Sequence, residues 1–282
     1  MQHARRDAEY AAPGIDLVNG MIDGFNQRGW IRFAYDPGTM EWAGHARKAG
    51  QMALDDPLLA QWHVCQGTWF VGVDALDNDA AGRVGGSEPL GGPAVAFIAA
   101  HLGGLPALHK GQISVVWPGY PKPREGETAA AFRYRANRDG AHLDGVKPVG
   151  KARRRMIDEP HAFILGLPLT ENAPGAAPLV VWEGSHMTMG RALRRALSEH
   201  DPADWGRVDL TEAYGLARRE VFDTCRRVVV HGVPGEAFLL HRLALHGVAP
   251  WVAPSEAGPL GRMIAYFRPP MPGGAVAWLH EN

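Results

Sequence analysis

The chain has 282 residues, with 29 lysines and arginines against 30 aspartates and glutamates, and a formal net charge of -1. This balance provides no basic field that would attract nucleic acid or an anionic membrane. Only two cysteines are present, Cys65 and Cys225, too few for a disulfide framework, which fits a reducing cytoplasm. No run reaches the about 20 apolar residues of a membrane span. The N-terminal Met1 to Tyr10 leads into no apolar run of the kind that follows in a secretory signal.

The first part of the chain, residues 1–110, has a mostly helical pattern. Apolar residues at helical spacing predict helices over 15–27, 40–54 and 93–102, with a short strand at 30–33. Pro93 suits the first turn of the third helix.

From Gln112 onward the pattern changes to short β-type runs separated by turns of proline, glycine and asparagine. The runs cover 113–117, 131–135, 161–169, 178–182, 227–231, 237–240 and 263–267. This rhythm is typical of a β-sandwich or barrel. A helical insertion at about 187–220 interrupts it, with Leu193 and Leu197 four residues apart. We therefore expect one α+β, mainly β domain over 1–282, with its β core at 111–270.

The motif Gly140-Ala141-His142-Leu143-Asp144-Gly145 follows the strand expected at 132–135. On an extended chain residues i and i+2 point to the same side, so His142 and Asp144 can face one metal ion. Such a pair arises often by chance, and a third ligand must come from elsewhere.

His246 is the candidate third ligand, because it lies just beyond the strand expected at 237–240. Two histidines and one carboxylate on one face of an ion leave three positions open, the arrangement of non-haem iron(II) oxygenases. Taken alone, His246 is better explained as a turn histidine.

Arg262 lies at the start of the strand run that follows His246. An arginine inside an apolar strand is costly unless it is paired. Its planar guanidinium suits a bidentate carboxylate, such as one end of a dicarboxylate co-substrate. The alternative is an edge arginine that reaches solvent.

These motifs together resemble the phytanoyl-CoA dioxygenase family over nearly the whole chain. The similarity is carried by His142-x-Asp144, the segment 161–172, Glu183-Gly184-Ser185-His186, His246-Gly247, Arg262 and the N-terminal segment 22–31. It implies a double-stranded β-helix core (a jelly roll, as in cupins) with N-terminal helices and one helical insertion.

The resemblance also implies a chemistry. His142, Asp144 and His246 would bind iron(II), and Arg262 would bind 2-oxoglutarate. Together with O2, the enzyme would hydroxylate or otherwise oxidise a small organic substrate, with succinate and CO2 as co-products. The interval from His246 to Arg262 is longer than in the family, so Arg268 is the alternative carboxylate ligand. Two other functions stay open: a metal-dependent cupin-type enzyme, or a non-catalytic binding protein of the same fold, neither using 2-oxoglutarate.

Four residues near the motif are candidates for contact with the substrate: Trp117, Arg133, Tyr134 and Arg153. Arg153 belongs to a basic stretch, 147–155, that could clamp an anionic substrate over the metal. The plainer interpretation is a solvated loop whose cations pair with Asp158 and Glu159. For Trp117, packing in the core is the plainer role. The Glu183-Gly184-Ser185-His186 turn is expected to be structural.

Overall fold

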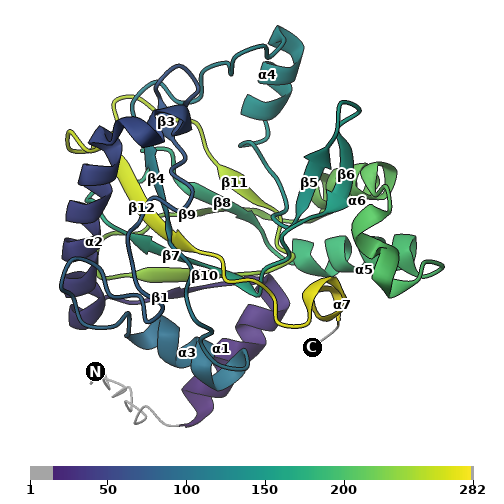
Figure 1. Ribbon diagram of the computed structural model, residues 1–282, viewed down its shortest axis with the longest axis horizontal. Coiled ribbons are helices and arrows are strands. Elements are labelled where there is room, and N and C mark those ends of the chain that lie inside the picture. The colour runs from purple at the N-terminus through teal and green to yellow at the C-terminus, as the bar shows by residue number, and fades with distance from the viewer. Residues whose placement is uncertain (1–14, 281–282) are drawn as a thin grey trace, which may run out of the picture.

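The computed structural model describes residues 15–280, and the segment Met1 to Tyr10 lies outside them (Figure 1). None of the helices within this range combines the length and the apolarity that crossing a bilayer demands. The expected mixture of helices and antiparallel β-sheets is confirmed.

The N-terminal part contains the expected helices and first strand. Its elements are α1 (Ile15–Arg28), β1 (Trp30–Phe33), α2 (Pro37–Asp55), the 3-10 helix η1 (Pro57–Trp62), β2 (His63–Val64), β3 (Trp69–Phe70) and α3 (Pro93–His101). Helix α2 begins where the Asp36 carboxylate accepts a hydrogen bond of 2.8 Å from the Thr39 amide, which satisfies a free donor of the first turn.

Two antiparallel sheets form the centre of the protein. The seven-stranded sheet has the order β1-β10-β7-β12-β4-β3-β2, and the three-stranded sheet has the order β11-β8-β9. The strands not yet placed are β4 (Gln112–Val116), β7 (Phe163–Pro168), β8 (Leu179–Trp182), β9 (Arg227–Val230), β10 (Ala237–His241), β11 (His246–Val248) and β12 (Arg262–Phe267). A separate hairpin pairs β5 (Val146–Val149) with β6 (Arg154–Ile157).

The two larger sheets pack face to face, because one buried cluster takes residues from both. Ile164, Leu240 and Ile264 come from the large sheet, and Leu179 and Val181 from the small one. The outer face of the large sheet is covered by α2 and α3, whose side chains share a second cluster with the strands (Figure 1).

The alternation of side chains along β12 decides where its arginines point. Met263, Ala265 and Phe267 pack in the outer cluster with the helices, whereas Ile264 belongs to the cluster between the sheets. Because successive side chains of a strand point to opposite faces, Arg262 lies on the inner side with Ile264.

The helical segment between β8 and β9 consists of α5 (Ser185–Leu197), η2 (Pro202–Arg207) and α6 (Thr211–Thr224). It packs with α7 (Gly274–Leu279) beside the sheets through a third cluster, which includes Leu193, Tyr214 and Trp278 (Figure 1). Both leucines of the expected helical stripe, Leu193 and Leu197, are fully buried there.

The strand predicted over 131–135 is wrong, because these residues form the helix α4 (Ala129–Ala136). Alanines 129–131 have the highest helix propensity, and the Thr128 hydroxyl caps the helix by accepting a hydrogen bond of 3.2 Å from the Ala131 amide. The alternation of Phe132 and Tyr134 therefore does not reflect a buried face. Arg133 and Tyr134 are exposed on this projecting helix and do not lie on a core strand.

Candidate metal centre

His142 and His246 are held side by side by their own backbones. The amide of each donates to the carbonyl of the other, at 2.8 Å from His142 and 3.1 Å from His246. Residues that exchange both hydrogen bonds lie directly opposite each other in an antiparallel pair. Their rings consequently face each other, with centroids 4.5 Å apart.

Asp144 completes the group from the same extended segment as His142. One Asp144 oxygen, Oδ1, lies 3.3 Å from Nε2 of His142, and the other, Oδ2, lies 3.8 Å from Nε2 of His246. Each of the three residues offers one ligand atom, and these atoms all lie within 4.8 Å of one another. The intervening Leu143 is buried in the cluster beneath the helices. The structure therefore brings together the three residues that the sequence pointed to.

The imidazole rings are oriented with Nε2 toward the shared space. Nδ1 of His142 lies 3.1 Å from the Gly140 carbonyl, and Nδ1 of His246 lies 3.0 Å from the Ala244 carbonyl. A carbonyl can only accept, so Nδ1 carries the proton and Nε2 presents its lone pair. This tautomer is the one in which a histidine binds a metal through Nε2.

The protonation states at neutral pH also suit metal binding. Burial acts to raise the pKa of Asp144, but the neighbouring His142, His246 and Arg268 together hold it well below its usual value. Burial lowers the pKa of His246 to about 4. The group thus holds a carboxylate next to a neutral imidazole, the forms in which these side chains are metal ligands.

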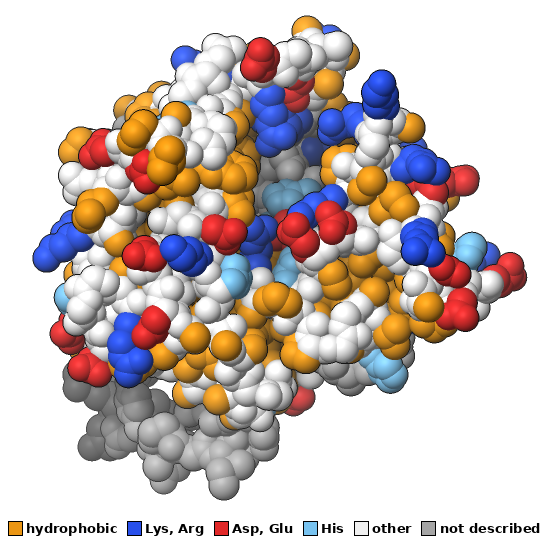
Figure 2. Space-filling model, in the orientation of Figure 1, with side chains coloured by type: hydrophobic (Ala, Val, Ile, Leu, Met, Phe, Trp, Pro, Cys, Tyr) orange, Lys and Arg blue, Asp and Glu red, His pale blue; other side chains and the backbone are white. Residues whose placement is uncertain are grey.

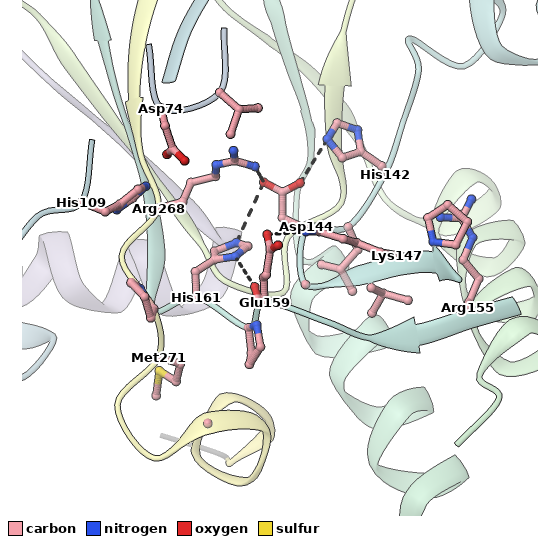
Figure 3. Close-up of a pocket in the computed structure, with 18 of the residues that line it drawn as sticks. Asp74, His109, His142, Asp144, Lys147, Arg155, Glu159, His161, Arg268 and Met271 are labelled. Atoms are coloured by element: carbon pink, nitrogen blue, oxygen red, sulfur yellow. Dashed lines mark hydrogen bonds and ion pairs between the residues drawn. The ribbon is translucent and has the colours of Figure 1, made fainter. Parts of the chain in front are cut away.

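Two further side chains approach the same Oδ2 atom of Asp144 that lies toward His246. Nη1 of Arg268 donates to Asp144 Oδ2 at 3.2 Å, and the buried Nε2 of His161 lies 4.0 Å from the same oxygen. Figure 3 shows Asp144 between Arg268 and His142, with His161 near the same carboxylate. Sequence spacing gave no signal for His161, since it comes from the segment before β7 and reaches the site only through the fold.

Two cavities share the walls formed by His142, Asp144 and Arg268. The outer cavity, of about 820 Å³, opens on the face shown in Figure 2, where histidine and cationic side chains gather around a hollow. The inner cavity, of about 170 Å³, extends between the sheets and is also lined by His246 and Tyr266. Pockets for drug-sized ligands measure about 300–1,000 Å³. The outer cavity is therefore sized for an organic substrate and the inner one for a smaller molecule.

Arg262 is deeply buried on the inner side of β12, with 2% of its surface exposed. Its three guanidinium nitrogens have no partner with hydrogen-bond geometry among the described residues, and the side chain of Tyr266 is its polar neighbour. Burial raises the pKa of Tyr266, while the neighbouring Arg262 acts to lower it. Tyr266 also lines the inner cavity, although Arg262 itself does not. A buried cation of this kind needs an anionic partner, and the nearby cavity is where one can bind.

The extra residues between His246 and Arg262 lie outside the two sheets. They form a loop that is fastened to the segment before β8, where the Ala173 amide donates to Glu256 and the Val252 amide to Gly175. The longer interval is accommodated in this loop, and Arg262 remains paired with Val116 of β4.

The structure places none of the four expected substrate residues at the wall of either cavity. Trp117 stacks on His63 with ring centroids 6.1 Å apart, and Arg153 is exposed in the turn between β5 and β6. Arg133 and Tyr134 lie on α4. The basic stretch does reach the outer cavity, but through Lys147 and Arg155.

Burial also affects a second pair of histidines, His186 and His241, whose rings lie 4.7 Å apart. Nε2 of His186 donates to the Asn26 carbonyl at 2.8 Å, as expected for a structural residue at the start of α5. Burial lowers the pKa of both, and that of His241 lies well below its usual value, in part because of the His186 charge.

We expect the free energy of unfolding to fall when the pH is lowered from 7.5 to 5.5. The folded protein keeps this pair neutral, whereas histidines of the unfolded chain take up protons below about pH 6.5. Stability is therefore fully present above that pH and is lost toward the folded pKa values, by at most about 1.4 kcal/mol per pH unit for each histidine. Urea denaturation at both pH values, with a chelator present, measures the change.

The variant His241→Asn should show a shallower pH dependence than the native chain. The control is His45→Asn, at a half-buried histidine whose Nδ1 lies 3.0 Å from the Gly85 carbonyl. Equal stability of the native protein at the two pH values would contradict this account.

No family model matches this sequence, and no curated protein matches it. Several solved structures are similar in fold. EctD from S. alaskensis with bound Fe is 16% identical, with 92% of this chain and 78% of that chain covered and a TM-score of 0.47.

Two proteins from nogalamycin biosynthesis are similar at the same level. The non-heme alpha ketoglutarate dependent carbocyclase SnoK is 12% identical, with 92% of this chain and 89% of that chain covered and a TM-score of 0.43. The epimerase SnoN, also non-heme and alpha ketoglutarate dependent, is 13% identical, with coverage of 93% and 89% and a TM-score of 0.42.

Proposed function

We propose that this protein is an iron(II)- and 2-oxoglutarate-dependent oxygenase that hydroxylates, or otherwise oxidises, a small organic substrate. The observation that carries the proposal is the convergence of His142, Asp144 and His246 at the junction of two cavities. Two imidazoles and one carboxylate that leave positions open are typical of non-haem iron(II) oxygenases.

The donor set fits iron(II) in its chemistry as well as in its number. The Nδ1 protons of both histidines are tied to backbone carbonyls, so both Nε2 atoms are free to bind the ion. Arg268 and His161 approach Oδ2 of Asp144, which favours binding of the metal through one oxygen. Partners of this kind fix the orientation of metal ligands.

The inner cavity and Arg262 support 2-oxoglutarate as the co-substrate. When bound, 2-oxoglutarate supplies two electrons for oxygen activation as it is converted to succinate and CO2. Its far carboxylate requires a cation remote from the metal, and Arg262 is buried without a hydrogen-bond partner among the described residues. Arg268 is the weaker candidate, because it already binds Asp144.

The buried Arg262 also argues against the two alternative functions that do not use 2-oxoglutarate. A metal-dependent cupin-type enzyme or a binding protein that does not use 2-oxoglutarate has no need for a buried cation at position 262. Apolar side chains of the inner cavity, among them Ile164, Leu179 and Leu240, keep water away from the reacting centre.

We further propose that the two sheets form a double-stranded β-helix with the helices added around it. From β4 to β12 the chain passes repeatedly between the sheets, with β7, β10 and β12 in the large one and β8, β9 and β11 in the small one. His142 extends the small sheet through its bridge to His246.

Since Cys65 and Cys225 are both free thiols, we place the protein in the reducing cytoplasm.

The direct test is succinate release from 2-oxoglutarate under iron(II) and oxygen, with a panel of small organic acids, amino acids and neutral metabolites as substrates. We expect release that depends on all three reagents and is stimulated by at least one substrate class. Metal binding without any turnover of 2-oxoglutarate would favour the cupin-type alternative.

Loss of Arg268 should weaken metal binding without removing a ligand. In Arg268→Met, Asp144 loses the donor on Oδ2, and changes to such supporting partners typically cost about 10–100-fold in metal affinity. Equilibrium dialysis against iron(II) under anaerobic conditions measures the change. The control is Arg83→Met, which removes a surface arginine paired with Asp79. Unchanged affinity in Arg268→Met would show that Asp144 is oriented by other contacts.

A further inference from the structure

The outer cavity has cationic side chains in its wall, and all but one have a carboxylate partner. The four cations are Lys110, Lys147, Arg155 and Arg268. Three are paired: Lys110 with Asp77, Lys147 with Glu159, and Arg268 with Asp144. Arg155 has no carboxylate within 4.0 Å among the residues that the structure describes. Its charge is the one in this wall that has no such counter-ion.

The described neighbours of Arg155 are an aromatic ring and further cations. Its guanidinium lies over the Tyr214 ring, 5.2 Å from the centroid. Burial lowers the pKa of Arg155 and the charges of Arg218 and Arg153 act in the same direction, whereas Tyr214 acts to raise it. An arginine stays protonated under such conditions, so an anion is attracted to this part of the cavity.

The backbone of Arg155 is fixed, so its side chain is offered from a defined position. The Arg155 amide donates to the Thr211 hydroxyl at 2.8 Å, and its carbonyl accepts from the Leu210 amide at 2.7 Å. On the paired strand, Pro148 lies opposite Arg155 and also lines the cavity. The β5–β6 hairpin is thereby attached to the start of α6.

Arg155 and the metal centre lie at different parts of the same cavity. In Figure 3, Arg155 comes from the hairpin on one side, whereas Asp144 and Arg268 lie near the middle and Asp74 on the opposite side. A ligand held at Arg155 can therefore extend toward His142 and Asp144. Asp74, the cavity's remaining acid, lies on the opposite side of the cavity from Arg155 in Figure 3.

We propose that Arg155 binds an oxyanion of the substrate, a carboxylate or a phosphate, and so directs a distant C–H bond of the same molecule to the metal centre. The guanidinium can bind either group through two parallel hydrogen bonds. This assignment of the substrate class rests on the proposed oxygenase function, but binding of the anion can be measured without turnover.

The experiment compares four probes that differ only in their terminal group: hexanoate, hexyl phosphate, hexanol and hexylamine. Each is titrated calorimetrically into the full-length protein without metal or 2-oxoglutarate. We expect at least one of the two anions to bind about tenfold or more tightly than hexanol, the ratio that a difference of about 1.4 kcal/mol produces. The anion that binds more tightly shows whether the oxyanion that Arg155 binds is a carboxylate or a phosphate.

Two variants with the same change of charge locate the binding site. Arg155→Gln should lose the preference for anions, about tenfold or more in dissociation constant, whereas Arg154→Gln should keep it. Arg154 is the adjacent residue of β6, is exposed and does not line the cavity. Arg155→Lys, which keeps the charge, should retain part of the preference, and circular dichroism checks that all three variants are folded.

Equal binding of hexanol and both anions, or anion binding that survives in Arg155→Gln, would overturn the assignment. Absence of succinate release in a protein that keeps Arg155-dependent anion binding would instead count against the oxygenase function alone. With an active substrate in hand, Arg155→Gln should raise its KM, and Arg154→Gln should not.

Discussion

Replacing Asp144 with asparagine should reduce iron(II) affinity by more than about 100-fold, beyond the range seen when only a supporting partner is lost. The change keeps the shape of the side chain but removes the anion that the two imidazoles share. Arg268 then faces a neutral amide in place of a carboxylate, so no negative charge remains to offset the ion. Succinate release should be lost together with the metal.

Equilibrium dialysis and turnover measure this effect, with Asp74→Asn as the matched control. Asp74 lines the same outer cavity, and its replacement changes the charge by the same amount. The control should bind iron(II) like the native chain. Native iron stoichiometry and affinity in Asp144→Asn would remove the carboxylate from the proposed ligand set.

Arg262→Met should abolish the response to 2-oxoglutarate while leaving iron(II) binding nearly intact. Loss of one partner of a buried charge pair costs on the order of 2–5 kcal/mol, or about 30-fold or more in dissociation constant. The unliganded variant should be no less stable than the native protein, since the guanidinium has no hydrogen-bond partner among the described residues.

Thermal unfolding with and without 2-oxoglutarate, under anaerobic iron(II), measures both the stability of the unliganded variant and its stabilisation by 2-oxoglutarate. A ligand at 100 times its dissociation constant stabilises the folded state by about 2.7 kcal/mol, so the native protein should shift clearly and Arg262→Met should not. Arg268→Met should behave in the opposite way: its metal affinity should fall, whereas the site for the far carboxylate of 2-oxoglutarate should remain. If the two variants exchange these phenotypes, Arg268 is the residue that binds 2-oxoglutarate.

Secondary-structure elements could be predicted from the sequence where their burial pattern is visible within the element itself. Helix α1 and strands such as β7 and β10 were predicted because their apolar periodicity reflects burial along a single element. Helix α4 was missed because Phe132 and Tyr134 alternate as in a strand, whereas the Thr128 cap and three alanines favour the helix.

The residues of the candidate site also differ in whether local sequence or the tertiary fold brings them together. His142 and Asp144 are two residues apart, so local geometry alone suggested that they act together. His246 depends on the register of a strand pair formed across the fold, and the family resemblance was needed to suggest it. His161 reaches the cavity from the segment before β7, and no spacing rule connects it to the motif. The basic stretch 147–155 could be predicted as an anion clamp, but only the tertiary structure shows that Lys147 and Arg155 are its cations at the cavity wall.

The paired backbones of His142 and His246 have a consequence for the energetics of the whole chain. The two residues are 246 − 142 = 104 positions apart in the sequence, yet an ion bound to both would act as a cross-link between them. Closing a loop of that length removes conformational entropy from the unfolded chain, as a disulfide does. A bound ion would therefore strengthen the edge of the small sheet at β11, where the 140–142 segment is attached by a single bridge. Metal loading and attachment of this segment to the small sheet would then be one cooperative event.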